Sequence, residues 1–410
     1  MEEKRNVPKL RFPGFTDSWE QRRLGELVEE TYGGGTPKTS VPEYWGGDIP
    51  WIQSSNVIEG ELFNIDIPKA ITDKGLRESA AILIPGSSIA VVTHVGVGKL
   101  VYLPFSFTTS QDFVSLSRLK TNSIFLCYAL FRRLQTEINM VQGSAIKGIT
   151  KAELLDKRID IPHDVEQTQI GAFFQKLDSL IALHQRELDH VKELKKGLLQ
   201  KMFPKEGTNV PELRFPGFTD PWEQRRLGEV AHRVTRKNEE GMSDLPLTIS
   251  AQHGLVDQRD FFNSQVASRD MRGYYLLERG EFAYNKSTSS DSPWGAIKRL
   301  TEYEKGCLST LYICFGLDEG DPDFLVTYYE TSRWHRGIRM IAAEGARNHG
   351  LLNIAPGDFF ETELTLPGKI EEQTAIGALF AKLDSLIALH QRELDHVKEL
   401  KKGLLQQMFV

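Results

Sequence analysis

The sequence lacks the features of secreted, membrane-spanning and zinc-binding proteins. Its 410 residues include three cysteines, too few for a disulfide framework, and no CxxC or paired histidine spacing favours a zinc site. The most apolar stretch, residues 82–103, is interrupted by His94 and Lys99, so we expect no membrane span. The first residues have no apolar core of a signal peptide. We therefore expect a protein of the reducing cytoplasm with no metal ligand.

Catalytic motifs are also missing. Residues 33–39 resemble a phosphate-binding loop, but Pro37 occupies the position of a glycine that such a loop requires. Neither GxGxxG at the start of a helix, nor GxSxG, nor HExxH occurs, and the (D/N)PP(Y/F) signature of amino-methyltransferases is absent. No motif therefore supports a catalytic centre.

Positive charge is not in excess. Fifty Lys and Arg residues against 56 Asp and Glu give a net charge of −6, which argues against a protein held to nucleic acid by bulk charge alone. Apolar residues at 40% and charged residues at 26% are ordinary proportions for a folded globular protein. The length is sufficient for two or three domains.

What the sequence does contain is an internal repeat. Residues 6–26 recur at 209–229 with two differences over 21 positions. Residues 177–203 recur at 383–409 with one change over 27 positions, Lys201 to Gln407. We call these repeated segments the frame. Because the frame is nearly identical in both halves, we expect it to do the same job twice.

The segments between the repeats differ from one another. Residues 27–165 (module one) and 230–371 (module two) show no such identity. Module one has a strand-like run at 89–92 and an amphipathic helix at 125–140. In module two we expect one strand over 307–315 and one helix over 324–340. Two different α+β modules are thus predicted to sit in identical frames.

The longer repeat has the periodicity of a helix. Apolar side chains recur at three- and four-residue steps, and charged residues occupy the other faces. From Glu166 to Phe203 such a helix would be about 57 Å long at 1.5 Å per residue. A stripe this narrow requires a partner, so we expect the two copies to form an antiparallel coiled coil. The stripe consists of Leu177, Leu180, Ile181, Leu188, Val191, Leu194 and Leu198, and of Leu383, Leu386, Ile387, Leu394, Val397, Leu400 and Leu404.

Three features together resemble the DNA specificity subunit of type I restriction–modification systems. Residues 10–26, with Leu-Arg-Phe-Pro-Gly-Phe at their start, resemble the segment that leads into each target-recognition domain. Residues 34–51, with Gly-Gly-Thr-Pro-Lys and Tyr-Trp-Gly-Gly-Asp-Ile-Pro-Trp, resemble the start of a common type of that domain. The Glu-Gln pairs at Glu166 and Glu372 resemble the start of the conserved helices. Module two lacks the second feature and resembles a different subtype.

The resemblance implies a non-catalytic subunit of a bacterial or archaeal complex. Residues 1–165 and 204–371 would be target-recognition domains, each reading one half of a bipartite site in double-stranded DNA. The conserved helices, 166–203 and 372–410, would set the spacer and dock two methyltransferase subunits. This chain would bind no cofactor. Partner subunits would use S-adenosylmethionine for adenine-N6 methylation, and restriction subunits would use ATP and Mg for translocation and cleavage.

The resemblance also implies base-reading side chains on loops. Neither module is basic: module one has 13 Lys and Arg against 15 acids, and module two has 16 against 21. We therefore expect partner subunits to neutralise much of the DNA phosphate charge while this chain reads base edges. The candidates have major-groove pairing chemistry. They are Thr36, Lys38, Gln53, Ser55, Asn56, Ser110, Gln111 and Lys147 in module one, and Gln252, Asn285, Lys286, Ser287, Arg347, Asn348 and His349 in module two.

A protein of another class would share many of these features. A scaffold that binds protein partners through two modules and a coiled coil, with no role on DNA, is compatible with the modest charge. Binding of the chain and its methyltransferase partner to random-sequence and genomic DNA would separate the two interpretations.

Overall fold

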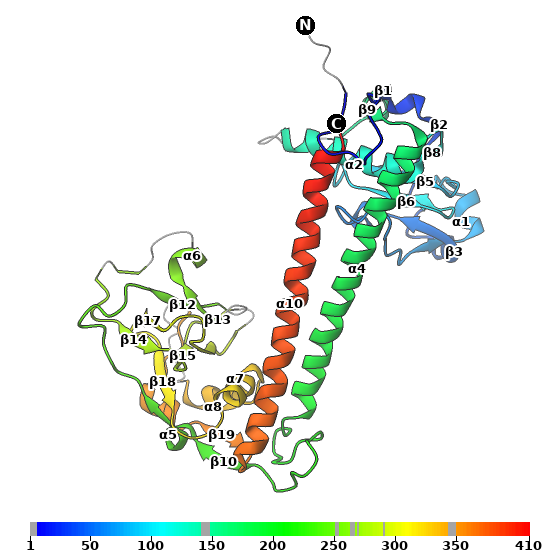
Figure 1. The fold of residues 1–410 in the computed structure, drawn as a ribbon. Helices are drawn as coiled ribbons and strands as arrows, with labels where there is room; N and C mark the ends of the chain where they lie inside the picture. Colours follow the sequence, from blue (N-terminus) through cyan, green and yellow to red (C-terminus); the bar gives the residue numbers. More distant parts are fainter. Residues whose placement is uncertain are drawn as a thin grey trace. The chain divides into compact units, whose positions relative to one another are not determined.

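The chain folds into two compact units, each built around one module (Figure 1). Unit 1 comprises Met1–Gln185 with Arg392–Val410, and unit 2 comprises Arg186–Gln391. Each unit therefore contains one module and a part of both long helices. The computed structural model describes residues 6–140, 148–250, 254–262, 267–268, 270–289, 292–342 and 350–410. Within these ranges, the helices are too short or too polar to cross a membrane.

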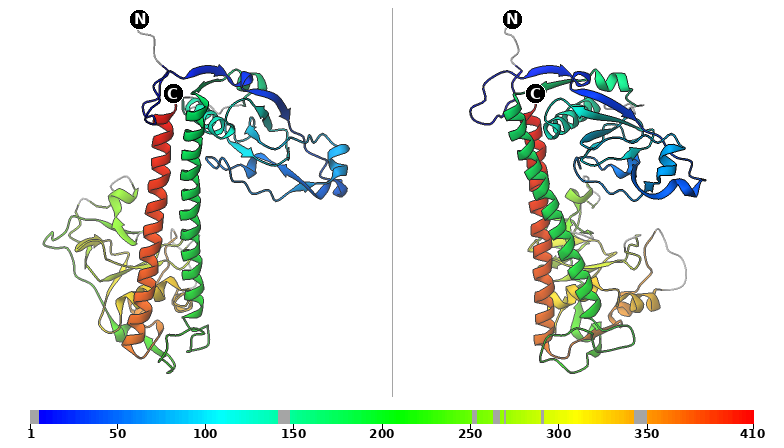
Figure 2. Two further views of the ribbon diagram at one scale, coloured as in Figure 1. Left: turned by 45° about the vertical axis from the view of Figure 1, so that its right-hand side comes forward. Right: turned by 90° about the vertical axis from the view of Figure 1, so that its right-hand side faces the viewer.

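Two long helices confirm the predicted coiled coil. Helix α4 (Asp164–Lys201) has 38 residues and α10 (Ile370–Met408) has 39. In unit 1 the first half of α4 lies beside the second half of α10, where Lys401 pairs with Asp178 (Figure 2). In unit 2 the second half of α4 lies beside the first half of α10, where Lys195 pairs with Asp384. The helices are antiparallel in both units.

The predicted apolar stripe is buried unevenly. Leu188 and Leu394, at the same position of the repeat, are each 1% exposed. Leu194 and Leu400, another matched pair, are each 45% exposed, and Leu180 is 38% exposed. The remaining residues are buried or half-buried; they are Leu177, Ile181, Val191, Leu198, Leu383, Leu386, Ile387, Val397 and Leu404.

Module one is built on a four-stranded antiparallel sheet in the order β2-β8-β5-β6. Helix α2 (Ser123–Met140) packs on this sheet and confirms the predicted helix. A smaller sheet, β4-β3-β7, lies in the same module. The strands of unit 1 are β1 (Glu20–Arg23), β2 (Val28–Gly33), β3 (Trp45–Ile52), β4 (Ala70–Ile71), β5 (Ser88–Val92), β6 (Leu100–Leu103), β7 (Thr108–Thr109), β8 (Phe113–Leu119) and β9 (Arg158–Ile161), of which β1 lies in the frame. The short helices are η1 (Leu24–Glu26), η2 (Pro42–Tyr44), η3 (Ser54–Asn56), α1 (Asp73–Arg77) and α3 (Lys151–Leu155).

Module two has a sheet of the same order, β11-β18-β15-β16, with the same antiparallel pairings. Two two-stranded sheets, β12-β13 and β14-β17, replace the smaller sheet of module one. The strands of unit 2 are β10 (Glu223–Arg226), β11 (Ala231–Arg233), β12 (Leu247–Ser250), β13 (Gly254–Asp257), β14 (Tyr275–Glu278), β15 (Phe282–Asn285), β16 (Ala296–Arg299), β17 (Lys305–Leu308), β18 (Ile313–Leu317) and β19 (Glu363–Leu366), of which β10 lies in the frame. The shorter helices of unit 2 are α5 (Leu227–Val230), α6 (Gln258–Phe262), α7 (Pro322–Glu330), α8 (His335–Ile341) and α9 (Pro356–Phe360).

Two predicted elements of module two were wrong. The single strand expected over 307–315 is two strands, β17 and β18, in different sheets, because the chain turns where the Tyr312 N–H donates to Ser309 O. The single helix expected over 324–340 is α7 and α8. Helix α7 ends where the Thr331 hydroxyl donates to the Tyr328 carbonyl at 2.6 Å. Both breaks occur at hydroxyl residues inside apolar runs, Ser309 and Thr331.

The frame packs the same four aromatic rings in each unit. Ring centroids lie 5.5–6.2 Å apart in unit 1 and 5.7–6.2 Å apart in unit 2. Three rings of each set lie in the frame or in a long helix, and one comes from the module. The sets are Trp19, Phe174, Phe409 and Phe125 in unit 1, and Trp222, Phe380, Phe203 and Phe324 in unit 2.

A buried ion pair ties each frame segment to the start of a long helix. In unit 1, Arg11 donates two hydrogen bonds to Glu166, at 2.6 and 2.7 Å. In unit 2, Arg214 donates two to Glu372, both at 2.7 Å. The glutamate side chains are 0% and 2% exposed. Bidentate pairing of this kind fixes both position and orientation.

The same segments cover the carboxyl ends of the long helices. The Leu10 N–H donates to the Gln407 carbonyl at 2.9 Å in unit 1, and the Leu213 N–H donates to the Lys201 carbonyl at 2.9 Å in unit 2. The last carbonyls of a helix have no partner within the helix, so these bonds satisfy groups that would otherwise be unpaired. The frame therefore makes the same contacts in both units, down to single hydrogen bonds.

Candidate nucleic-acid interface

Two parallel strands bring several candidate side chains of module one to one edge. Strands β3 and β7 pair in parallel, with Trp51 opposite Thr108 and Ile52 opposite Thr109. Parallel strands end at the same edge of a sheet, so the residues that follow them are neighbours. The Ser110 N–H donates to the Ile52 carbonyl at 2.8 Å. The loops that begin at residues 53 and 110 therefore lie together.

The glycine loop of module one joins the same edge. The Gly35 N–H donates to the Thr109 carbonyl at 2.8 Å, and the Trp51 indole donates to the Gly35 carbonyl at 3.2 Å. The Thr36 hydroxyl then donates to the Gln111 side-chain oxygen at 2.8 Å. Three segments far apart in sequence are thus assembled into one polar surface, which we call the loop edge (residues 34–38, 53–56 and 110–112).

The loop edge leaves no space for a side chain at Gly34. A Cβ atom there would lie 1.9 Å from the Ser110 carbonyl oxygen, whereas one at Gly33 would meet nothing within 4 Å. We expect Gly34→Ala to destabilise unit 1 by about 1–3 kcal/mol, because backbone would have to move. Gly33→Ala is the matched control and should change stability by less than about 0.5 kcal/mol. Equal unfolding temperatures for the two variants would contradict this packing.

The candidates of module one differ in what their side chains do. Thr36, Lys38, Ser55 and Gln111 are exposed. The remaining described candidates support the loops: Asn56 accepts from the Gln53 backbone at 3.0 Å, Gln53 donates to Ser55 at 2.9 Å, and the buried Ser110 donates to Asp112 at 3.2 Å. Lys147 lies outside the described residues. The exposed four are the side chains of the loop edge that face solvent.

The described candidates of module two lie at the end of strand β15 and just after it. Asn285 accepts from the Ser287 N–H at 3.0 Å, and Ser287 is exposed. Lys286 donates to the Ile354 carbonyl at 3.4 Å, and burial lowers the pKa of its ammonium group. Lys286 therefore points inward and holds the turn. Gln252, Arg347, Asn348 and His349 lie outside the described residues.

Sequence reasoning missed one element beside the loop edge. The turn between β5 and β6, residues 93–99, is anchored there because the Thr93 N–H donates to the Asp112 carbonyl at 2.7 Å. Its tip carries Val95, which is 71% exposed. The Val95 side chain has no pairing chemistry for base edges, so a search for polar residues could not select it.

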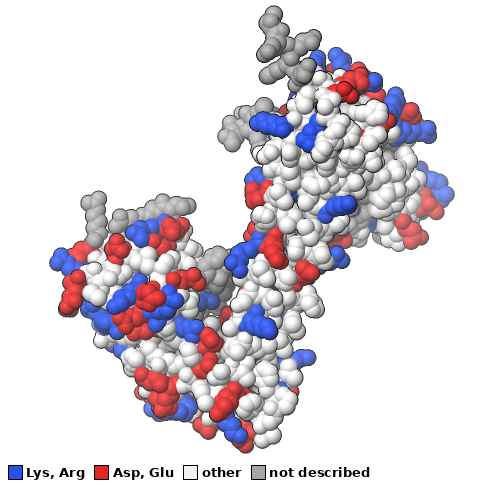
Figure 3. Space-filling view, viewed as in Figure 1, with Lys and Arg blue, Asp and Glu red and all other residues white. Residues whose placement is uncertain are grey.

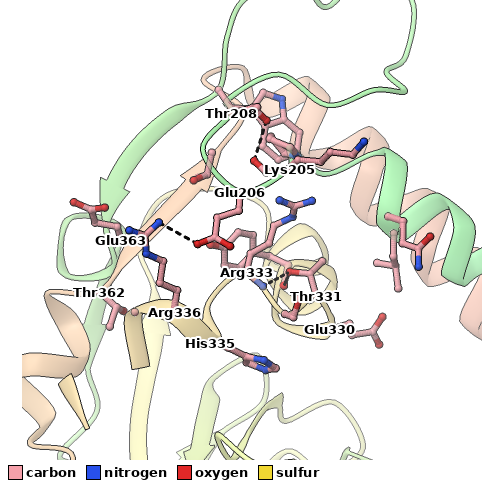
Figure 4. A pocket seen from close by; sticks show the side chains of 18 of the residues that line it. Lys205, Glu206, Thr208, Glu330, Thr331, Arg333, His335, Arg336, Thr362 and Glu363 are labelled. Atoms are coloured by element: carbon pink, nitrogen blue, oxygen red, sulfur yellow. Dashed lines mark hydrogen bonds and ion pairs between the residues drawn. The ribbon is translucent and has the colours of Figure 1, made fainter. Parts of the chain in front are cut away.

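An arginine-rich groove lies in unit 2, next to the end of α4 (Figure 4). It has a volume of about 1990 Å³. Its arginines are occupied by contacts within the unit: Arg333 donates to the Phe203 carbonyl at 2.7 Å, Arg336 pairs with Glu206 at 3.1 Å, and the Arg339 guanidinium lies 5.4 Å from the Trp294 ring. Burial lowers the pKa of Arg333. Arg333 therefore ties module two to the end of the long repeat, and the other two arginines make contacts outside it.

Charge on the visible face is mixed in both modules. Figure 3 shows Lys and Arg interspersed with Asp and Glu, and no broad basic area on that face. The view agrees with the net negative charge of each module's sequence. Any binding of DNA at the loop edge has to depend on contacts with individual groups more than on a basic field.

Comparison with known proteins finds a matching family model and several relatives of similar sequence. Residues 16–193 match the family model described as type I restriction modification DNA specificity domain. The specificity subunit of the type I restriction enzyme MjaIX from Methanocaldococcus jannaschii is 25% identical over 222 residues, 52% of this chain and 51% of that protein. The specificity subunit of EcoR124I/EcoR124II from Escherichia coli is 26% identical over 196 residues, 43% of this chain and 47% of that protein. The chain spans about half the length of these curated relatives.

Solved structures share the fold over nearly the whole chain. The crystal structure of the S subunit of a type I restriction–modification system from M. genitalium has a TM-score of 0.63 at 15% identity, covering 98% of this chain and 99% of that one. A second structure, described in terms of complex assembly and conformational transition of the type I R-M system, has a TM-score of 0.53 with the same identity and coverage.

Proposed function

We propose that this chain is a DNA specificity subunit of a type I restriction–modification system, because residues 16–193 match the model of that domain and the curated relatives are specificity subunits. Each module reads one half of a bipartite site in double-stranded DNA. The long helices set the spacer between the half-sites and dock two copies of a methyltransferase subunit. The chain itself carries out no chemistry; adenine-N6 methylation with S-adenosylmethionine, and ATP- and Mg-dependent translocation and cleavage, belong to its partners.

The observation that carries the proposal is one set of frame contacts around two unlike modules. The bidentate arginine–glutamate pair, the four-ring cluster and the covered helix end occur in both units. The loops that the frame holds have different sequences and different side chains. The same framework therefore holds two different sets of loops. This arrangement suits a protein whose two modules contact two different stretches of one DNA molecule.

Exposed leucines on the long helices support the docking role. Leu183 and Leu389 occupy the same position of the repeat and are 43% and 44% exposed, and Leu194 and Leu400 are each 45% exposed. Because matched positions are exposed in both units, one kind of partner can use the same contacts twice. Apolar groups on an otherwise charged helix face are the kind of surface that a stable partner covers.

Exchange of one module tests the proposal. We expect replacement of residues 230–371 by the corresponding segment of a relative to change one half-site completely and to leave the other unchanged, because the frame contacts are retained. The readout is methylation-sensitive sequencing of a genome that carries the chain with its methyltransferase partner. A specific site differs from non-specific DNA by roughly 10³–10⁷ in affinity, so the change of motif is all-or-none.

The same experiment separates DNA recognition from scaffolding. A scaffold with no role on DNA would give no defined motif with either form of the chain. A change in both half-sites would contradict independent reading. Tight, salt-sensitive DNA binding by the chain without its partner would contradict the division of labour in which partner subunits neutralise most phosphates.

A further inference from the structure

The turn between β5 and β6 of module one (residues 93–99) has a counterpart in module two. Strand β5 occupies the third position of the order β2-β8-β5-β6, and β15 occupies the third position of β11-β18-β15-β16. The chain leaves β5 at Thr93 and leaves β15 at Lys286. The counterpart of this turn is therefore the segment that begins at residue 286 and contains the candidate Ser287.

Hydrogen bonds confirm that the two turns are equivalent. In module one the Ile149 N–H donates to the Thr93 carbonyl at 2.8 Å. In module two the Leu352 N–H donates to the Lys286 carbonyl at 3.0 Å. Ile149 and Leu352 each follow closely on a glycine with positive φ, Gly148 and Gly350. Each turn is thus tied to the same part of its module.

The turn of module one is held rigidly although its tip is exposed. Thr93 is 1% exposed, and its hydroxyl and N–H both donate to the Asp112 carbonyl. The Val92 N–H donates to the Lys99 carbonyl at 2.8 Å, and the Gly98 N–H donates to the Val92 carbonyl at 3.1 Å. A tip that is fixed in advance loses little conformational entropy when it binds.

Val95 is the large apolar residue exposed at this tip, between the exposed His94 and Gly96, and the core does not require it. Its side chain is 71% exposed, so it contributes little to the core. It stands three residues from Val92 in a turn bonded to Asp112, whose neighbour Gln111 is an exposed residue of the loop edge. An apolar side chain among polar groups that face DNA has one base-specific partner in the major groove, the C5-methyl group of thymine.

We propose that Val95 contacts the C5-methyl group of a thymine in the half-site read by module one. The inference rests on the proposed function and adds to it one residue and the chemical group that it recognises. It predicts that the half-site of module one contains a thymine whose methyl group, rather than its hydrogen-bonding edge, is recognised.

The test uses the whole chain in complex with its methyltransferase partner, on DNA that carries the mapped motif. Each thymine of the motif is replaced in turn by deoxyuridine, which lacks only the C5-methyl group, and affinity is measured by competition. We expect a loss of about fourfold at one position in the half-site of module one, the size expected for one buried methyl group. In Val95→Ala the same replacement should have no effect at that position.

Two controls define the result. Val95→Thr keeps one methyl group on a β-branched side chain and should retain sensitivity to deoxyuridine at that position. The half-site of module two should respond identically in wild type and both variants. Unfolding temperatures should be equal for all three proteins, because the altered side chain is exposed.

Two outcomes would overturn the inference and leave the proposed function intact, and a third would overturn the proposed function. If no thymine in the half-site of module one is sensitive to loss of its methyl group, Val95 does not read thymine. If Val95→Ala weakens binding to all sequences equally, the side chain acts as a non-specific wedge between bases. If the complex recognises no bipartite motif at all, the proposed function itself fails.

Discussion

Replacing Arg214 with methionine is expected to lower the free energy of unfolding of unit 2 by about 3–5 kcal/mol, because the change leaves a buried carboxylate without its partner. Glu372 is 2% exposed and accepts both hydrogen bonds of the Arg214 guanidinium. The bond to Glu372 raises the pKa of Arg214, so the arginine stays charged at any pH at which the protein folds. The Trp222 indole, 3.4 Å from the same carboxylate, offers one weak bond in compensation.

The matched control is Arg226→Met in the same unit. Arg226 pairs with Glu361 at 2.6 Å, but the two side chains are 61% and 62% exposed. Water replaces the lost partner there, so the cost should be below about 1 kcal/mol. Hydrogen exchange of the full chain, followed peptide by peptide, measures the loss of stability in unit 2 for each variant and shows whether unit 1 is unaffected. Equal losses in the two variants would show that burial of Glu372 does not matter.

A two-residue insertion in each long helix is expected to abolish recognition, whereas a four-residue insertion should preserve it. The suitable places are between Glu187 and Leu188 in α4 and between Leu389 and His390 in α10. The Glu187 carboxylate lies 3.8 Å from His390 Nδ1, so these breaks face each other. Four residues turn a helix by about 400° and keep the apolar stripe in place, whereas two turn it by about 200° and remove it.

The four-residue variant also measures the spacer. Four residues add about 6 Å, and DNA rises about 3.4 Å per base pair, so the spacer should lengthen by one or two pairs. The two half-sites should keep their sequences. Genome methylation mapping reads both quantities in one experiment. An unchanged spacer would show that the helices do not set it, and changed half-site bases would show that the modules depend on it.

Much of the frame could be predicted from the sequence because it occurs there as a nearly identical repeat. The repeat predicted both long helices and their antiparallel pairing, and both helices begin within two residues of the Glu-Gln pairs. The ion pair of Arg11 with Glu166 was not predicted, although both residues were singled out. A repeat indicates that two segments matter, but pairing between positions 155 residues apart depends on how the chain closes in space.

The helices and strands inside the modules were harder to predict, because the residue at which each one ends depends on single side chains. The break between α7 and α8 is made by the Thr331 hydroxyl and the Trp334 indole, both bonded to carbonyls of α7. An apolar periodicity that continues across such a break favours one helix. The exposed polar residues of the loop edge were among the candidates chosen from the sequence, but Val95 in the neighbouring turn was not, because it carries no polar atom by which a sequence search could select it.

The division of the long helices between the units has a consequence during protein synthesis. Residues 392–410 supply Phe409 and Leu405 to the core of unit 1, where Phe409 lies 5.5 Å from Phe125 and 5.7 Å from Phe174. Unit 2, by contrast, is one continuous stretch of chain. The unit whose module leaves the ribosome first is therefore completed last. Until residues 392–410 have been synthesised, its aromatic cluster lacks the Phe409 ring. A nascent chain in this state exposes apolar surface and is a natural client for chaperones.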